Sequence, residues 1–192
     1  MVEKTVLVTG SEERVHEVAE ALRGEGVEVL EASDPGALAA VVAGRQIDAY
    51  VQLPARTRAQ GHSVIRRVRD FLASGLLERF KAVETVLPAL SENGAVVLVA
   101  GHLPDVASTP DDQQARVALL RVLGRAVQAE SAPTRIRVSV LGHDASSMQV
   151  VECALGREPA RSSNSTDVAV APTDVRYEDW RAEIIGLAYV ES

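Results

Sequence analysis

Two histidines stand where apolar segments end, and histidine is the side chain best suited to acid–base chemistry near neutral pH. His102 follows the apolar run 95–100, and His143 follows the run 135–141, each directly after a glycine. Loops that follow buried parallel strands are where ligands bind and chemistry occurs in open α/β sheets. We therefore take His102 and His143 as the candidate catalytic residues, acting as an acid–base pair.

A metal site built from histidines is the competing hypothesis. His16 and His62 also come after apolar runs, so all four histidines of the chain follow expected strands, and Asp105 and Asp144 are nearby carboxylates. The strands concerned would span about 14 Å at about 4.8 Å per strand, so four histidines cannot meet. None of the spacings resembles a local zinc motif. Histidine is also common in exposed loops, and we predict no metal.

The segments that would position these residues alternate between strand-like and helix-like patterns. Expected strands cover 5–9, 27–32, 47–53, 95–100, 135–141 and 167–171. Helical periodicity covers 12–23, 35–44, 63–90, 111–130 and 146–155, with a short helix at 177–185. Alternating strands and helices predict an α/β fold, a doubly wound and mainly parallel sheet with helices on both faces.

Composition limits the class of protein further. The 192 residues are 46% hydrophobic but only 3% aromatic, which suits a core of aliphatic side chains around a parallel sheet. A net charge of −7 argues against partners such as nucleic acid or an anionic membrane. A single cysteine, no apolar run of membrane-spanning length and no expected signal peptide indicate a cytoplasmic protein. We expect one domain, 1–192, with the tail 172–192 packed on it.

Four segments resemble, in order, the short-chain dehydrogenase/reductase (SDR) family. They are "TVLVTG", "IDAYVQLPA", "FKAVETVLPALSENGAVVLVAG" and "LLRVLGRAVQAESAPTRIRVSVLG". The resemblance implies a Rossmann fold and an ancestry among NAD(P)-dependent oxidoreductases. Only one helix fits between the strands 27–32 and 47–53, so the third strand of the family is missing and about six strands remain.

The family's cofactor loop, Thr-Gly-x-x-x-Gly-x-Gly, is only partly retained. The segment reads "TGSEERVH", with Gly10 kept but Arg14 and His16 in the next two glycine positions. Glu12 and Glu13 add negative charge where a pyrophosphate would lie. The resemblance gives these cofactor-binding candidates: Thr9, Gly10, Ser11, Arg14 and Asp34. We predict no cofactor, with NAD(P) as the alternative because Arg14 could offset the acidic charge.

The family's Asn-Ser-Tyr-Lys tetrad has no counterpart in the sequence. The asparagine position falls on Gly75 and the serine position on Gly101. The tyrosine and lysine positions fall on Gln113 and Val117, or on Gln114 and Ala118. A glutamine cannot replace a phenol as proton donor. The sequence therefore favours a non-catalytic protein with a structural, regulatory or ligand-binding role. The alternatives are an NAD(P)-dependent oxidoreductase with altered residues, or different chemistry at His102 and His143.

The expected helix 111–130 is apolar on more than one face, and the excess apolar surface indicates a partner. In the resembled family, the helices equivalent to 63–90 and 111–130 form a dimer interface. We predict a homo-oligomer through these two helices, with Leu119 and Leu123 as test positions. An active SDR relative is the other partner considered.

Overall fold

The computed structural model describes residues 4–32, 35–54, 77–101, 110–131, 134–157 and 168–169. Six strands form one sheet in the order β2-β1-β3-β4-β5-β6. The strands are β1 (Thr5–Thr9), β2 (Glu28–Ala32), β3 (Ile47–Gln52), β4 (Leu90–Val99), β5 (Arg137–Leu141) and β6 (Val168–Ala169). The first five are parallel, and β6 pairs antiparallel with β5. The predicted α/β fold is confirmed.

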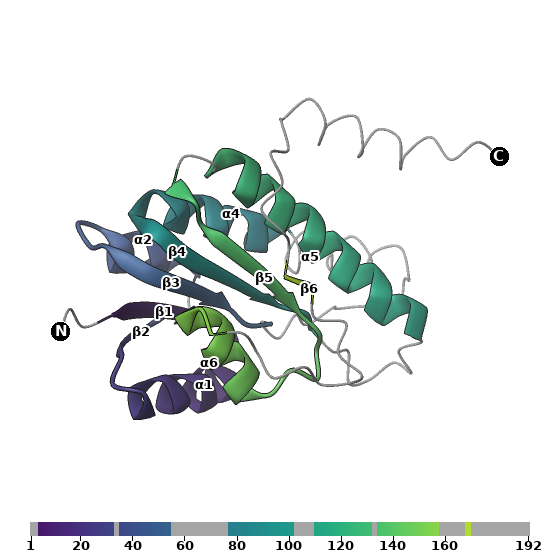
Figure 1. Cartoon of the computed structure of the whole chain (residues 1–192), viewed down its shortest axis with the longest axis horizontal. Coiled ribbons are helices and arrows are strands. Elements are labelled where there is room, and N and C mark those ends of the chain that lie inside the picture. The colour runs from purple at the N-terminus through teal and green to yellow at the C-terminus, as the bar shows by residue number, and fades with distance from the viewer. Residues whose placement is uncertain are drawn as a thin grey trace.

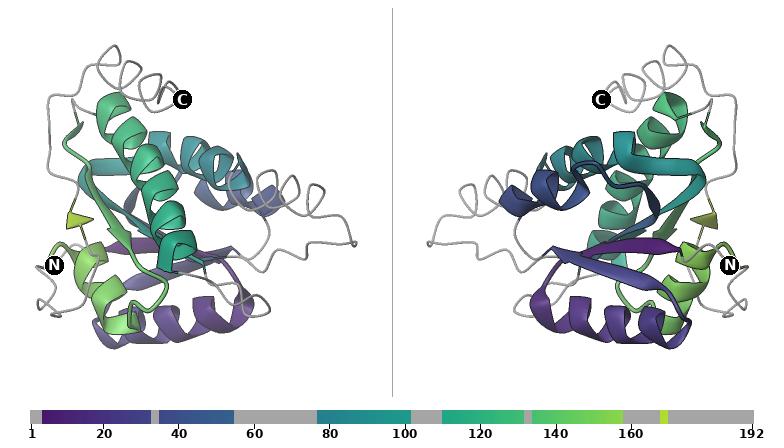
Figure 2. Two further views of the ribbon diagram at one scale, coloured as in Figure 1. Left: turned by 90° about the vertical axis from the view of Figure 1, so that its right-hand side faces the viewer. Right: turned by 90° about the vertical axis from the view of Figure 1, so that its left-hand side faces the viewer.

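Helices cover both faces of the sheet, as Figures 1 and 2 show. They are α1 (Glu12–Gly24), α2 (Leu38–Val42), α4 (Glu78–Val86), α5 (Pro110–Glu130) and α6 (Ser147–Leu155). Helices α1 and α6 pack side by side on one face, whereas α2, α4 and α5 lie on the other. The described residues between β2 and β3 hold only a 3-10 turn, Pro35–Ala37, and α2, so no extra strand lies there.

The core consists of two aliphatic layers, one on each face of the sheet. Alternate residues of a strand point to opposite faces, so Val6 and Val8 pack under α1 and α6 while Leu7 packs toward α2 and α4. Both faces are buried in this way. For this reason the central strands read as continuous apolar runs, and these were easy to recognise in the sequence.

Strand β4 begins earlier than the apolar pattern predicted. It starts at Leu90 instead of 95, and its pairing with β3 shifts register between Ile47 and Ala49. Asn93 adopts a positive φ of 60° within this irregular stretch. The polar segment 91–93 is exposed or half-buried, so it carries no apolar signal.

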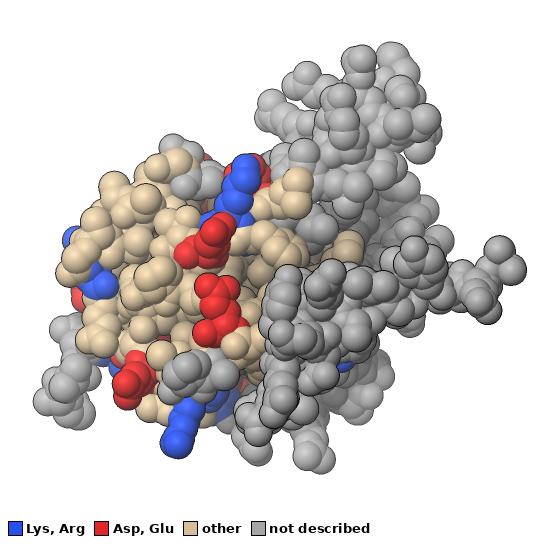
Figure 3. Space-filling view, turned by 90° about the horizontal axis from the view of Figure 1, so that it is seen from above, with Lys and Arg blue, Asp and Glu red and all other residues tan. Residues whose placement is uncertain are grey.

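Helix α5 presents one face to the sheet and another outward. Leu123 is only 3% exposed and belongs to the core layer shared with β4 and β5, whereas Leu119 is 36% exposed. Because Leu123 is buried in this chain's own core, a charge reversal there would disturb folding as well as any interface, so Leu119 is the better test position. From the side of α2, α4 and α5, charged side chains are scattered across a mainly uncharged described surface (Figure 3).

Several predicted features fall outside the described residues. These are His62, His102, Asp105, Asp34, Gly75, the segment 63–76 and the tail 172–192. Within the part of the chain that the structure describes, no helix is long and apolar enough to cross a membrane.

Candidate functional site

The strand order reverses between β1 and β3, which lie next to each other at the centre of the sheet. From β1 the chain crosses to β2 on one side, and β3 and β4 continue on the other side. Ligands of open α/β sheets bind near the carboxyl ends of the strands at such a reversal. The candidate site is therefore the edge at which β1, β3 and β4 end, near Thr9, Gln52 and Val99.

The connection from β1 to α1 is only two residues long, Gly10 and Ser11. Gly10 has a φ of 145°, and a Cβ added there would lie 2.6 Å from the Leu53 Cβ. The Leu53 amide donates to the Thr9 carbonyl at 2.8 Å, and the Ser11 amide donates to the Pro54 carbonyl at 3.1 Å. The connection is thus fastened against the segment that follows β3, and the Ser11 amide is already used.

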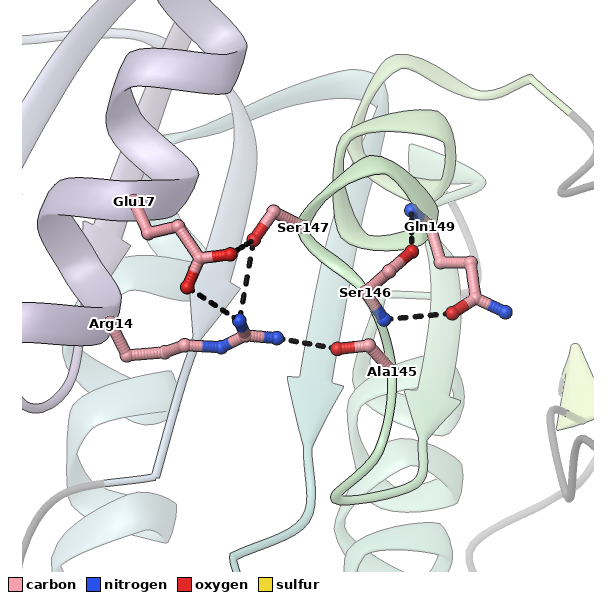
Figure 4. A network of polar contacts seen from close by, with 6 residues as sticks. All are labelled: Arg14, Glu17, Ala145, Ser146, Ser147 and Gln149. Carbon is pink, nitrogen blue, oxygen red and sulfur yellow. Dashed lines mark hydrogen bonds and ion pairs between the residues drawn. The ribbon is translucent and has the colours of Figure 1, made fainter.

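Arg14 and His16, which occupy the glycine positions of the resembled loop, lie within helix α1. His16 is exposed. The Arg14 guanidinium turns toward α6, where Nη2 donates to the Ala145 carbonyl and Nη1 lies 3.3 Å from the Ser147 Oγ (Figure 4). Nη1 also forms an ion pair with Glu17 at 2.7 Å. Arg14 is therefore engaged in joining two helices.

The beginning of α6 is rigidly organised where Arg14 meets it. Ser146 is the N-cap, its Oγ accepting from the Gln149 amide at 3.2 Å, and the Gln149 side chain accepts from the Ser146 amide at 2.8 Å. This reciprocal capping box satisfies two free amides of the first turn. Hydrogen bonds from Ser147 and then Arg14 lower the pKa of the Glu17 carboxyl, which also lies close to the positive end of the α6 dipole.

A second polar group lies on the α4 face at the ends of β3 and β4, and the sequence analysis missed it. Arg79 Nε donates to the Gln52 Oε1 at 2.8 Å, and Nη2 donates to the carbonyls of Gln52 at 3.0 Å and Val99 at 2.9 Å. Burial lowers the pKa of Arg79 to about 10, so the guanidinium still carries its charge at neutral pH. One side chain from α4 thus bridges two neighbouring strand ends.

The group continues from β3 to β1. Gln52 Nε2 lies 3.1 Å from the Tyr50 hydroxyl and 3.1 Å from the Arg79 carbonyl, and the Tyr50 hydroxyl lies 2.9 Å from the Thr9 Oγ1. Tyr50 is fully buried, and burial raises its pKa. The sequence feature that could have indicated this group is the pair Tyr50 and Gln52, two polar residues two positions apart in an otherwise apolar strand.

The structure brings together only part of the predicted site. Thr9, Gly10 and Ser11 lie at the carboxyl edge, whereas Arg14 points away from it to α6. Gly101 follows β4, and a Cβ there would lie 3.2 Å from the Pro54 Cβ, a tight contact.

The structure describes only one of the two candidate catalytic histidines. His143 is half-buried after β5 and Asp144 is exposed, but His102 lies outside the described residues, so their pairing stays a prediction. Among the described residues, no group of three or more His, Cys, Asp and Glu could hold a metal ion.

Comparisons with known proteins give a fold. No protein-family profile matches the chain, and no curated protein matches it. Among solved structures, a protein from Burkholderia multivorans described as a short-chain alcohol dehydrogenase is 17% identical with a TM-score of 0.58. The match covers 82% of this chain and 92% of that one.

Two further solved structures give the same result. BdcA, solved in complex with NADPH, is 14% identical with a TM-score of 0.51, over 71% of this chain and 68% of its own. A double mutant of a Serratia marcescens SDR is 16% identical with a TM-score of 0.52, over 69% and 73%. At these identities the likeness establishes the fold alone, an SDR-like Rossmann fold.

Proposed function

We propose that this chain, which has an SDR-like Rossmann fold, is a non-catalytic protein with a ligand-binding, regulatory or structural role. The observation that carries the proposal is the engagement of Arg14 with α6, beside a β1–α1 connection of only two residues. Residues in the position of a dinucleotide-binding loop here serve to join two helices.

The charge and hydrogen bonding of the connection support this proposal. A pyrophosphate at a helix N-terminus needs free backbone amides and a favourable field. The Ser11 amide is bonded to Pro54, and Glu12 and Glu13 place two carboxylates in the first turn of α1. The site of cofactor phosphate binding in the fold is thus electrostatically unfavourable for a phosphate.

The ends of β3 and β4 support it as well. Gly101 supplies no hydroxyl after β4, and Arg79 from α4 binds the last carbonyl oxygen of each strand. The side chains described at this edge thus include an arginine bound to two strand ends and a fully buried Tyr50, and the tetrad positions carry no tyrosine or lysine.

The second candidate is an NAD(P)-dependent oxidoreductase with altered residues. It is favoured by Gly10, which retains the positive φ typical of a glycine at the start of a dinucleotide loop, and by a structural neighbour solved with NADPH. A third reading, an enzyme that uses His102 and His143, is favoured by His143 following β5 at the same edge as Thr9.

We further propose that the protein is cytoplasmic and acts as a homo-oligomer through helices 63–90 and 111–130, or with an active SDR relative. The outward face of α5 supports the oligomer, since Leu119 is exposed there beside Ala118, which is exposed, and Val122, which is half-buried.

Cofactor titration tests the proposal. NADH and NADPH are titrated by nicotinamide fluorescence and by calorimetry up to about 1 mM, the upper end of usual Michaelis constants, with an NADPH-binding SDR as positive control. We expect no saturable signal from this chain. Saturable binding together with turnover of a carbonyl or alcohol substrate would establish the oxidoreductase instead.

A further inference from the structure

Among the described residues, no carboxylate is bonded to the Arg79 guanidinium. Its hydrogen-bond acceptors are the Gln52 amide oxygen and two main-chain carbonyls, all neutral. Burial lowers its pKa, and no carboxylate among the described residues counteracts this effect. Desolvated cations in proteins are normally paired with an anion, because an unpaired one is costly.

The hydrogen bonds that Arg79 makes within the described part of the chain leave one end of its guanidinium, Nη1, unused. Arginine has five N–H donors, and the bonds to Gln52 and Val99 use the one on Nε and the two on Nη2. Neither hydrogen of Nη1 has an acceptor among the described residues. The amide of Gln52 and the strand carbonyls fix the plane of the guanidinium, so Nη1 is held in one orientation.

The hydrogen bonds that lead away from Arg79 run in one direction. Gln52 Oε1 faces Arg79 Nε, so its Nε2 must donate to the Tyr50 hydroxyl. The buried Tyr50 hydroxyl then donates to Thr9 Oγ1. The hydroxyl hydrogen of Thr9, at the end of β1, is left to donate elsewhere. The cluster Thr9–Tyr50–Gln52–Arg79 therefore has a surplus of donors and a net positive charge.

We propose that Arg79 is the receptor for an oxyanion, a carboxylate or phosphate group of a small molecule, which accepts from Nη1 at the carboxyl edge of β3 and β4. Charged donors to carboxylate or phosphate give the stronger class of hydrogen bond. The inference rests on the ligand-binding form of the proposed function, and it names the chemical class of the ligand. It does not depend on the β1–α1 connection.

The test follows the Arg79 Nε–H signal by ¹⁵N-resolved NMR of the whole wild-type chain. Sodium phosphate and sodium acetate are titrated separately, with sodium chloride at equal ionic strength as reference. We expect a saturable shift of the Arg79 signal with one or both oxyanions and none with chloride. Saturation with phosphate alone indicates a phosphate ligand, and with acetate alone a carboxylate ligand.

A pair of variants locates the effect. In Arg79→Lys the oxyanion-dependent rise in thermal unfolding midpoint should be lost. In Arg45→Lys it should persist, because Arg45 is exposed at the opposite, amino-terminal edge of β3. If Arg79→Lys does not fold, the wild-type titration decides alone, with the signal assigned by backbone-linked experiments.

Two results would overturn the inference. One is an Arg79 Nε–H chemical shift that changes with phosphate and acetate only as much as it does with chloride. The other is an equal rise in the thermal unfolding midpoint of wild type and folded Arg79→Lys on addition of the oxyanion. These results are distinguishable from failure of the proposed function. NADPH binding with turnover would refute the non-catalytic role and leave the oxyanion result standing, whereas flat phosphate and acetate titrations would leave the non-catalytic role standing.

Discussion

The Ser147 hydroxyl donates a hydrogen bond to the Glu17 carboxylate, with 2.5 Å between the two oxygens, across 130 positions of sequence. Arg14 binds the other oxygen of the same carboxylate and also the Ala145 carbonyl. This arrangement joins the amino-terminal half of α1 to the first turn of α6 (Figure 4). It explains why an arginine is useful where the resembled family has a glycine.

Removing the Arg14 guanidinium should weaken this junction. We expect Arg14→Met to lower the free energy of unfolding by about 1–2 kcal/mol. Charged hydrogen bonds contribute about 1.5–3 kcal/mol, and the 28% exposure of this side chain reduces that value by solvent screening. Urea denaturation measures the change.

Arg23→Met is the matched control on the same helix. Arg23 pairs with Glu20 and Glu31 but is 42% exposed, and its loss should lower the free energy of unfolding less than the loss of Arg14 does, because solvent screens exposed ion pairs. Equal losses in the two variants would mean that Arg14 is an ordinary surface ion pair.

The Glu17 carboxyl should titrate below its ordinary pKa of 4.5, because Ser147 and then Arg14 favour its ionised form. A lowered folded-state pKa contributes stability that is present above the unfolded-state pKa and lost as the pH falls through the folded-state value. The stability difference between wild type and Glu17→Gln should therefore be constant from about pH 6 upward and vanish in acid. Ser147→Ala should raise the Glu17 pKa in a carboxyl NMR titration, and an unchanged value would refute the assignment.

Gly10 should tolerate no side chain, because its φ is 145° and an added Cβ would lie 2.6 Å from the Leu53 Cβ. We expect Gly10→Ala to lower the free energy of unfolding by about 2 kcal/mol or more, from strain and overpacking together. Gly24→Ala, at the end of α1 with no atom within 4 Å of the added Cβ, should stabilise by up to about 1 kcal/mol. Thermal or urea unfolding measures the stability of both variants. An equal change in the free energy of unfolding would contradict the close approach of Gly10 to Leu53.

Leu119 tests the expected oligomer, since it is the exposed large apolar residue of α5. We expect the wild type to elute as a dimer in size-exclusion chromatography with light scattering, and Leu119→Glu to elute as a folded monomer. Glu130→Lys, an exposed charge change on the same helix, should leave the dimer intact. A wild-type monomer, or a Leu119→Glu dimer, would refute an interface on this face.

The sequence alone determined the elements that bury apolar side chains on a regular period. β1 was predicted with its observed bounds, and α1 to within one residue, because Val15, Val18, Ala19 and Leu22 repeat with the helical period. β5 was predicted two residues too long at its start. Arg135 has a positive φ of 54°, and a backbone conformation of this kind leaves no trace in hydropathy.

The tertiary structure alone decided the polar part of the site. Arg79 reads in the sequence as one more charge on a helix, and Gln52 as the last residue of a strand. Only the packing of α4 over the ends of β3 and β4 places the guanidinium on both strand carbonyls. Likewise, the sequence motif places Arg14 in a phosphate-binding loop, whereas the packing of α6 against α1 brings its guanidinium to the Ala145 carbonyl. The period of hydropathy along the chain indicates which side chains are buried. Hydrogen bonds between distant residues depend on how the elements pack, and no periodic pattern in a single sequence indicates them.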